Sequence, residues 1–346
     1  MRTLYLTILI ILLIIHHNVE LKAQWIQANT GLSNASITGI VNSGTNIYAS
    51  TSGQGVYLST NNGTSWSTIN DGITNLDVRV LTVSGVNLFA GSYLSNIFLS
   101  TNNGISWKKI DNRGALSFAV KGTTIFAGTP GDCVILSTNN GESWKQAGLG
   151  GCFISSLAFS DKYLFAGTLG SGIFISSDEG ISWNQINNGL TNKTVYSLAV
   201  SGTNVFAGTD QGVFLSTNNG TNWIRTTTYY GVLALAVVDK KIFCGTQYGG
   251  VYLTTNNGTN WTQVNTGLTT SYIYSFGVVG TDLFAGTYNS GVYRRSLNDW
   301  MSIITPENSI GGLIPPISFK WKVNPKGLAY TYQISTKADF SDLLIN

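Results

Sequence analysis

The sequence has few of the groups that usually carry out acid–base, nucleophilic or metal chemistry. Its 346 residues include only 2 histidines and 3 cysteines, and charged residues make up 10% of the chain, against about 25% in an ordinary soluble domain. Both histidines, His16 and His17, lie in an N-terminal stretch that we expect to be removed. The mature protein would then contain no histidine, which excludes Ser-His-Asp and Cys-His nucleophile pairs, histidine-bound zinc and histidine-bound haem.

Positive charge is also scarce. The formal net charge is +3, and the lysines and arginines form no cluster along the chain. A nucleic-acid partner is therefore not expected, because phosphate binding needs a concentrated basic patch. The chain nevertheless has 43% hydrophobic and 12% aromatic residues together with 40 glycines. This composition predicts a folded protein with a sizeable core and an uncharged polar surface.

The N-terminus has the pattern of a signal peptide. A short positive region is followed by an apolar run from Leu4 to Ile15, and Ala23 is a small residue suited to signal peptidase. We therefore expect residues 1–23 to be removed and the protein to be secreted or displayed at the cell surface. The run is shorter than the roughly 20 residues that span a membrane, so no transmembrane segment is expected in the mature chain. An uncleaved N-terminal anchor is the alternative.

A repeat of about 39 residues governs the chain from residue 24 to residue 304, and this period is in the range of propeller blades. Its most regular string is Phe-Ala-Gly-Thr, as at Phe206 to Thr209. The aromatic residue of each copy is Tyr48, Phe89, Phe126, Phe165, Phe206, Phe243 or Phe284.

Each repeat unit is predicted to form four short strands. In the fifth unit these are residues 195–200, 205–209 and 212–216, followed by a strand that begins at Trp223. The Asn218-Asn219-Gly220 turn separates the third and fourth strands, where glycine tolerates positive φ. Four-stranded units at this spacing close on themselves, so the sequence predicts an all-β, seven-bladed β-propeller.

The sequence leaves two ways to close the ring. Trp25 and the residues after it match the segment that begins at Trp183, so they resemble a fourth strand without a preceding blade. This segment would complete the last blade, or the segment at Trp300 would do so. We favour the N-terminal segment, because the last copy of the repeat has lost its glycine turn.

A second string in each unit resembles the Asp-box, or BNR repeat, with the pattern Ser-x-Asp-x-Gly-x-x-Trp. Asparagine replaces the acid in every good copy except one, and an amide still caps such a turn. The matching positions are Ser59, Asn61, Gly63, Trp66; Ser100, Asn102, Gly104, Trp107; Ser137, Asn139, Gly141, Trp144; Ser176, Asp178, Gly180, Trp183; Ser216, Asn218, Gly220, Trp223; Thr254, Asn256, Gly258 and Trp261.

The resemblance implies a fold rather than a function. Asp-box propellers include sialidases, xyloglucan-type glycosidases, sortilin-like receptors and photosystem II assembly-factor-like proteins. In these families the Asp-box lies opposite the active site, which implies structural roles for its residues here. Loss of the carboxylates weakens a calcium interpretation. No metal or cofactor is expected.

Carboxylates are the only groups left for an enzymatic site. The chain has no Arg-Ile-Pro segment and too few suitably placed arginines for a sialidase. A glycosidase needs two carboxylates across the scissile bond, and Asp77 beside Arg79 is the best single candidate. An ion pair that lines the ring is the simpler interpretation. The other aspartates predicted on the ligand face are Asp71, Asp111, Asp132 and Asp210.

The same face is predicted to carry several tyrosines, which suit sugar stacking or protein anchoring. We therefore expect a non-catalytic recognition module for a polysaccharide or protein ligand, with a glycoside hydrolase that uses Asp77 and a second carboxylate as the alternative. The propeller is expected to be monomeric. The ligand-binding candidates are Arg79, Tyr93, Tyr229, Tyr230, Tyr248, Tyr272 and Tyr288.

Two further features concern the cysteines and the C-terminus. Cys133 and Cys152 are both predicted to lie toward the ligand face, so they are a possible disulfide in an exported protein, whereas Cys244 is expected to be a buried thiol. Residues 305–315 resemble a linker. Residues 316–346 resemble the start of a fibronectin type III or immunoglobulin-like module, a truncated β-sandwich, which implies a longer multidomain protein.

Overall fold

The structure is a computed structural model that describes residues 24–32, 34–227, 229, 231–299, 318–323 and 330–335. The expected signal peptide and linker lie outside these residues. The chain divides into two compact units, residues 1–300 and residues 301–346. Among the described residues, no helix is long and apolar enough to cross a membrane.

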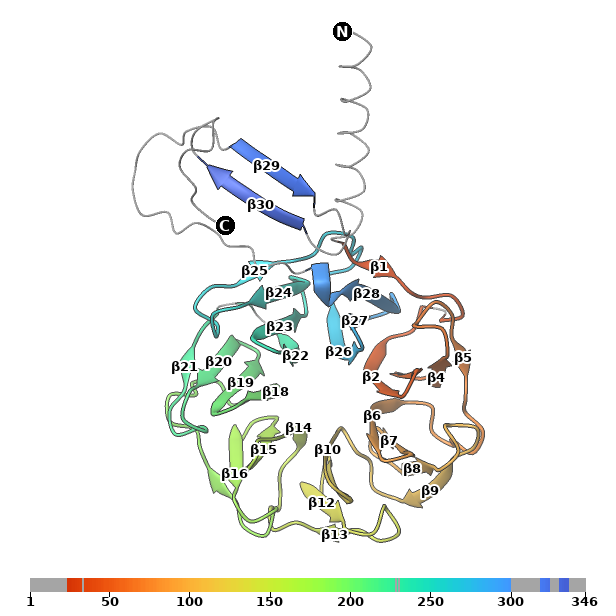
Figure 1. Ribbon diagram of the computed structural model, residues 1–346. Helices are drawn as coiled ribbons and strands as arrows, with labels where there is room; N and C mark the ends of the chain where they lie inside the picture. The colour runs from red at the N-terminus through yellow and green to blue at the C-terminus, as the bar shows by residue number, and fades with distance from the viewer. Residues whose placement is uncertain are drawn as a thin grey trace, which may run out of the picture. The chain divides into compact units, whose positions relative to one another are not determined.

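The first unit is a ring of seven four-stranded antiparallel sheets, as predicted (Figure 1). Blades 1 to 4 comprise β2 (Ile37–Ser43), β3 (Asn46–Thr51), β4 (Gly55–Ser59), β5 (Ser67–Thr68); β6 (Val78–Ser84), β7 (Asn87–Ser92), β8 (Ile97–Ser100), β9 (Lys108–Asp111); β10 (Ser117–Lys121), β11 (Thr124–Gly128), β12 (Val134–Ser137), β13 (Lys145–Gln146); and β14 (Ile154–Phe159), β15 (Leu164–Thr168), β16 (Ile173–Ser176), β17 (Asn184–Gln185). Blades 5 to 7 comprise β18 (Val195–Ser201), β19 (Asn204–Thr209), β20 (Gly212–Ser216), β21 (Ile224–Arg225); β22 (Val232–Val238), β23 (Lys241–Thr246), β24 (Val251–Thr254), β25 (Thr262–Gln263); and β26 (Ile273–Val279), β27 (Asp282–Thr287), β28 (Val292–Ser296), β1 (Ile26–Gln27).

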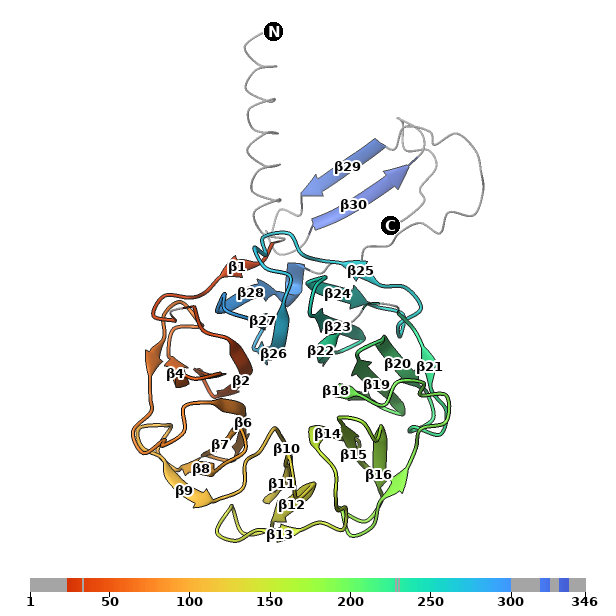
Figure 2. The same ribbon diagram turned by 180° about the vertical axis from the view of Figure 1, so that it is seen from behind.

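The N-terminal segment closes the ring. Strand β1 pairs antiparallel with β28, with Ile26 opposite Arg294 and Gln27 opposite Tyr293. Trp25 is 2% exposed, and its indole Nε1–H donates to the Val264 carbonyl at 2.7 Å. The favoured N-terminal closure is therefore confirmed, and blade 7 combines strands from both ends of the propeller, which lie side by side in Figures 1 and 2.

The second strand of each blade forms the core, because it is covered by the strands beside it and by the neighbouring blades. Phe89 is fully buried, and a Cβ built on Gly141 of the next blade would lie 2.7 Å from its ring. Gly141 also has φ +87°, a conformation that disfavours other residues. Phe284 and Gly63 make the same contact between blades 7 and 1, so the repeated Phe and the turn glycine pack on each other at these two junctions.

The turn between the third and fourth strands has the same polar network in each good repeat. In blade 1 the Gly63 N–H donates to Ser59 Oγ at 2.9 Å, and Asn61 Oδ1 accepts from Ser59 Oγ and from the Ser65 N–H. Asp178 takes the place of Asn61 in blade 4, where hydrogen bonds from Ser182 lower its pKa to about 2. The side-chain oxygen at this position therefore organises the turn, whether it comes from an amide or a carboxylate.

In the second unit, the described residues form one two-stranded antiparallel sheet. Strand β29 (Ser318–Val323) pairs with β30 (Tyr330–Ser335), and Trp321 lies opposite Tyr332. The β-sandwich module itself remains a prediction.

Candidate functional site

The propeller has two chemically different faces. The turns from the first to the second strand and from the third to the fourth lie on one face. The opposite face, called here the loop face, is formed by the turns between second and third strands and by the connections that enter each inner strand. The described candidate residues of the predicted ligand site belong to the loop face. Tyr230 lies outside the described residues.

The inner strands carry an irregularity at their loop-face ends. In six of them the pairing register shifts after the first residue, which leaves the second residue in a β-bulge. Bulges redirect side chains and are common beside functional sites. These strands surround the propeller axis (Figure 2). The bulge residues are Thr38, Arg79, Ser155, Tyr196, Leu233 and Tyr274.

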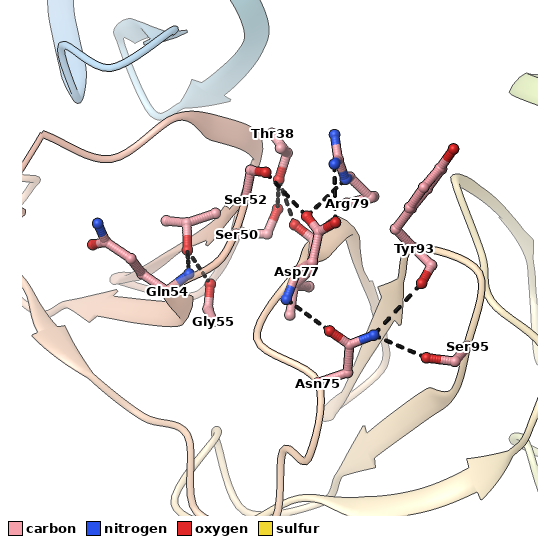
Figure 3. Close-up of polar contacts among 12 residues, drawn as sticks. Thr38, Ser50, Ser52, Gln54, Gly55, Asn75, Asp77, Arg79, Tyr93 and Ser95 are labelled. Atoms are coloured by element: carbon pink, nitrogen blue, oxygen red, sulfur yellow. Dashed lines mark hydrogen bonds and ion pairs between the residues drawn. The ribbon is translucent and has the colours of Figure 1, made fainter.

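Arg79 and Asp77 form a closed ion pair at this position. Arg79 Nη2 donates to Asp77 Oδ2 at 2.9 Å, and Arg79 Nε lies 2.8 Å from Oδ1. Ser52 Oγ donates to the same Oδ1 at 3.1 Å. The Arg79 guanidinium carbon lies 4.9 Å from the centre of the Tyr93 ring (Figure 3). Asp77, Arg79 and Tyr93 are thus brought together, as the sequence suggested for the first two.

Asn75 holds this group in place. Its Oδ1 accepts the Asp77 N–H at 3.0 Å, and its Nδ2 donates to Ser95 Oγ at 2.8 Å (Figure 3). The Tyr93 N–H donates to the Asp77 carbonyl at 2.9 Å. Backbone and side-chain bonds therefore fix both loops that contribute to the group, and its geometry is set before any ligand arrives.

Three of the loop-face aspartates are held by partners in the chain. Besides Asp77, Asp111 accepts from Arg113 Nε at 2.8 Å and Nη2 at 2.7 Å, and Asp210 accepts from the Tyr196 hydroxyl at 2.6 Å. Partial burial of Asp111 disfavours its charged form, but the hydrogen bonds from Arg113 outweigh this, and the pKa of Asp111 is lowered. The lowered pKa makes Asp111 a poor proton donor near neutral pH.

Four tyrosines form a group on blades 6 and 7, called here the tyrosine cluster: Tyr248, Tyr272, Tyr274 and Tyr288. The ring centre of Tyr272 lies 5.0 Å from that of Tyr288, 5.3 Å from that of Tyr274 and 6.3 Å from that of Tyr248. Tyr248 is 72% exposed and Tyr288 is 47% exposed. The exposed rings of Tyr248 and Tyr288 thus pack against the less exposed rings of Tyr272 and Tyr274.

Two loop-face phenols, Tyr272 and Tyr196, stay protonated at neutral pH. Burial, followed by the neighbouring Tyr274, raises the pKa of Tyr272 to about 12. Burial and the hydrogen bond to Asp210 raise the pKa of Tyr196. The sequence did not identify Tyr196 or Tyr274 as candidates. Both are the second residue of an inner strand. This shared position identifies them as loop-face residues only when the β-bulge at that position is known.

The other predicted tyrosines do not join this cluster. Tyr93 lies beside Arg79, and Tyr229 stacks on Tyr252 with ring centres 3.9 Å apart. The structure therefore brings together three of the predicted tyrosines, Tyr248, Tyr272 and Tyr288, and places Tyr229 in a separate aromatic pair.

The two cysteines predicted to pair are neighbours and are free thiols in the structure. Cys133 Sγ accepts the Cys152 N–H at 2.5 Å, and Cys133 has φ +57°, where most blades use glycine. Burial, followed by the contact with Cys133, raises the pKa of the Cys152 thiol to about 12. Cys244 is a buried free thiol, as expected. The disulfide remains a prediction.

The described residues contain no group of three or more His, Cys, Asp or Glu side chains that could hold a metal ion. The loop face offers guanidinium, phenol, hydroxyl and amide groups beside its carboxylates. These suit binding through hydrogen bonds and ring contacts.

This fold and face define a seven-bladed β-propeller with a preformed, aromatic loop face. No family model matches the chain, and no curated protein matches it in sequence. Solved structures do match in fold. YCF48 bound to D1 peptide is 15% identical with a TM-score of 0.65, and the match covers 79% of this chain and 96% of that one.

Two further structures come from larger proteins. The extracellular domain of the putative one-component system BT4673 from B. thetaiotaomicron is 16% identical with a TM-score of 0.67, over 78% of this chain and 39% of that one. The Niastella koreensis GH74 enzyme is 14% identical with a TM-score of 0.57, over 75% of this chain and 43% of that one. This chain thus spans about two fifths of either protein. At these identities the likeness concerns the fold alone.

Proposed function

We propose that the propeller is a non-catalytic recognition module that binds a segment of a protein partner on its loop face. The observation that carries the proposal is the tyrosine cluster, in which exposed Tyr248 and Tyr288 rest on Tyr272 and Tyr274. Rigid aromatic rings bury a large area with little loss of conformational entropy, so they are common anchors of protein interfaces. Arg79 and Tyr93 add a second contact on the same face.

Fold neighbours support this choice of ligand class. YCF48, which has the same propeller fold, is seen bound to a peptide, and the BT4673 structure is the extracellular domain of a putative one-component system. Polysaccharide is the other ligand class that exposed tyrosines suit. The packing of the rings on one another favours protein, because it leaves Tyr272 and Tyr274 only partly accessible for face-on stacking with a sugar.

The glycoside hydrolase alternative has little support from the geometry. A glycosidase needs two carboxylates that face each other across the scissile bond, but Asp77 is already engaged by hydrogen bonds from Arg79 and Ser52. The likeness to the GH74 enzyme is one of fold. We therefore keep hydrolysis as an outcome of the test.

We further propose that the protein works outside the cytoplasm. The signal-peptide pattern of residues 1–23 supports this proposal. N-terminal sequencing of the exported protein should find Gln24 first. Retention of Met1 would instead support an uncleaved anchor.

The proposed function is tested by selecting ligands from a displayed peptide library and from a glycan array with the exported protein. Tyr248→Ala and Tyr288→Ala should each weaken the selected peptides at least fivefold, which corresponds to about 1 kcal/mol for an interface anchor. Ile181→Ala is the matched control, because Ile181 is 77% exposed on the opposite face. Glycan ligands alone, or hydrolysis lost in Asp77→Asn, would refute the proposal.

A further inference from the structure

A cavity of about 280 Å³ lies on the loop face between blades 2 and 3, across the ring from blades 6 and 7 (Figure 1). Two loop-face turns contribute to it, residues 92–96 between β7 and β8 and residues 129–133 between β11 and β12. The connection from β9 to β10 completes the wall. The lining residues include Leu94, Asn112, Arg113, Thr129, Pro130 and Asp132.

Leu94 adds an apolar side chain to this wall in a backbone conformation that disfavours leucine. It is 62% exposed and has φ +59°. The equivalent turn residue is Gly170 in blade 4 and Asn289 in blade 7, and these residue types tolerate positive φ. A leucine at this place adds backbone strain and buries little apolar surface, so the needs of the fold do not account for it. Strained residues of this kind gather at ligand sites.

The turn that carries Leu94 is held by its neighbours. The Asn96 N–H donates to the Asn112 carbonyl at 3.2 Å. Gly114 passes so close that a Cβ built on it would lie 2.7 Å from the Leu94 nitrogen. The backbone at Leu94 is therefore fixed, and its exposed side chain keeps its place at the cavity.

The turn of blade 3 brings a carboxylate, that of Asp132, to the same cavity. The Asp132 N–H donates to Thr129 Oγ1 at 2.9 Å, and Gln54, Ser171 and Gly249 make the same bond in blades 1, 4 and 6. Asp132 is the one charged residue at this place in these four turns. It is exposed, and among the described residues no group donates a hydrogen bond to its carboxylate.

Arg113, the other charged residue of the wall, is already paired. Its Nε and Nη2 donate to the two carboxylate oxygens of Asp111 at 2.8 and 2.7 Å. This hydrogen bonding is the main cause of the raised pKa of Arg113, and the charge of Asp132 contributes less. Two carboxylates thus accompany one guanidinium, which leaves an excess of one negative charge at the cavity.

We propose that this cavity binds a basic side chain, lysine or arginine, of the partner segment. The aliphatic stem of that side chain packs against Leu94 and Pro130, and its cationic head lies beside Asp132. Long basic side chains commonly divide their contacts in this way between an apolar surface and a charge. The inference rests on the proposed function for the peptide nature of the ligand, and it adds that the recognised segment is basic.

The experiment titrates the ¹⁵N-labelled exported protein with three pentapeptides, acetyl-Ala-Ala-Xaa-Ala-Ala-amide, in which Xaa is lysine, arginine or glutamate. The backbone N–H signals of Gly114, Gly131 and Asp132 report on the cavity by NMR. The lysine and arginine peptides should shift these signals at millimolar concentration, and the glutamate peptide should not. Absence of any shift, or an equal or larger shift with the glutamate peptide, would overturn the proposal.

Two variants test the roles of the charge and the apolar wall. Asp132→Asn should weaken the lysine peptide about two- to fivefold, as expected for an exposed charge pair. Asp161→Asn is the matched control, because it removes the same charge from an exposed turn on the opposite face, and it should leave the titration unchanged. Equal effects of the two substitutions would contradict a role for Asp132.

Leu94→Asn should weaken the lysine peptide at least about twofold, since it removes apolar contact area. The thermal unfolding midpoint should stay the same or rise, because asparagine tolerates positive φ. A lower midpoint with unchanged affinity would show that Leu94 serves the fold and would overturn its role in binding.

Tyr248→Ala separates this inference from the proposed function. It should weaken the longer selected peptides and leave the lysine pentapeptide titration unchanged, because Tyr248 lies on blade 6. If the tyrosine variants bind the selected peptides normally while the lysine pentapeptide still shifts the cavity signals, the tyrosine-cluster proposal fails alone. If the selected peptides need the tyrosines but the lysine pentapeptide shifts nothing, the inference about this cavity fails alone.

Discussion

In most blades the tryptophan that begins the fourth strand donates its indole Nε1–H to a backbone carbonyl of the preceding blade, a contact called here the indole latch. This contact leads to a comparison of two conservative substitutions, Trp223→Phe and Trp261→Phe. Trp223 is 3% exposed and donates to the Ile186 carbonyl at 2.7 Å. Its replacement removes this hydrogen bond and leaves the acceptor without its donor, which costs about 1–3 kcal/mol. Loss of part of the ring adds a packing cost. Trp223→Phe should therefore lower the free energy of unfolding by roughly 2–4 kcal/mol.

Trp261→Phe removes a donor that is already buried without a partner. The packing cost is then offset by the release of an unsatisfied N–H, so its total should be about 2 kcal/mol smaller than for Trp223→Phe. The measurement is urea unfolding followed by far-UV circular dichroism, which does not depend on the replaced fluorophore. Trp144→Phe, the second unpaired indole, should behave like Trp261→Phe. Equal costs at positions 223 and 261 would refute the account of the latch.

Three further outcomes are expected. Gly141→Ala should destabilise the fold by well over about 1 kcal/mol, because the residue has φ +87° and its new Cβ would collide with Phe89. Gly122→Ala, at φ +61°, has open space around its Cβ and should cost only the backbone strain. Equal costs in a thermal unfolding assay would contradict the interblade contact. Because the folded pKa of Asp178 is depressed to about 2, its contribution to stability is present above pH 4 and lost as the pH falls toward 2. The difference in unfolding midpoint between the protein and Asp178→Asn should therefore shrink over that range. A constant difference would contradict a stabilising role of the carboxylate. Under oxidising conditions the protein should form the Cys133–Cys152 disulfide and leave one alkylatable thiol after denaturation, and three alkylatable thiols would exclude the bond.

The blade architecture was predictable because each blade repeats the same strand and turn sequence. The buried Phe, the glycine turn and the following Trp recur together, so one unit defines all the others. Even the closing strand could be assigned, because Trp25 begins the same segment as Trp183. Local sequence and packing between neighbouring blades agree at most junctions of the ring.

The candidate site was only partly predictable. The loop face followed from strand order, which placed Tyr248 and Tyr288 correctly. The place of Tyr274 in the tyrosine cluster could not be predicted from strand order. A β-bulge shifts the pairing register by one residue there, and an alternating sequence pattern does not reveal such a bulge. The unpaired Trp261 indole was also hidden, since its sequence motif is intact.

The most direct test of the central claim measures the affinity of a selected peptide for the exported protein and for its Tyr248→Ala, Tyr288→Ala and Ile181→Ala variants by isothermal titration calorimetry. The account predicts a loss of at least fivefold for each tyrosine variant and no change for Ile181→Ala. Unchanged affinity in both tyrosine variants, with the fold intact by circular dichroism, would contradict recognition through the loop face.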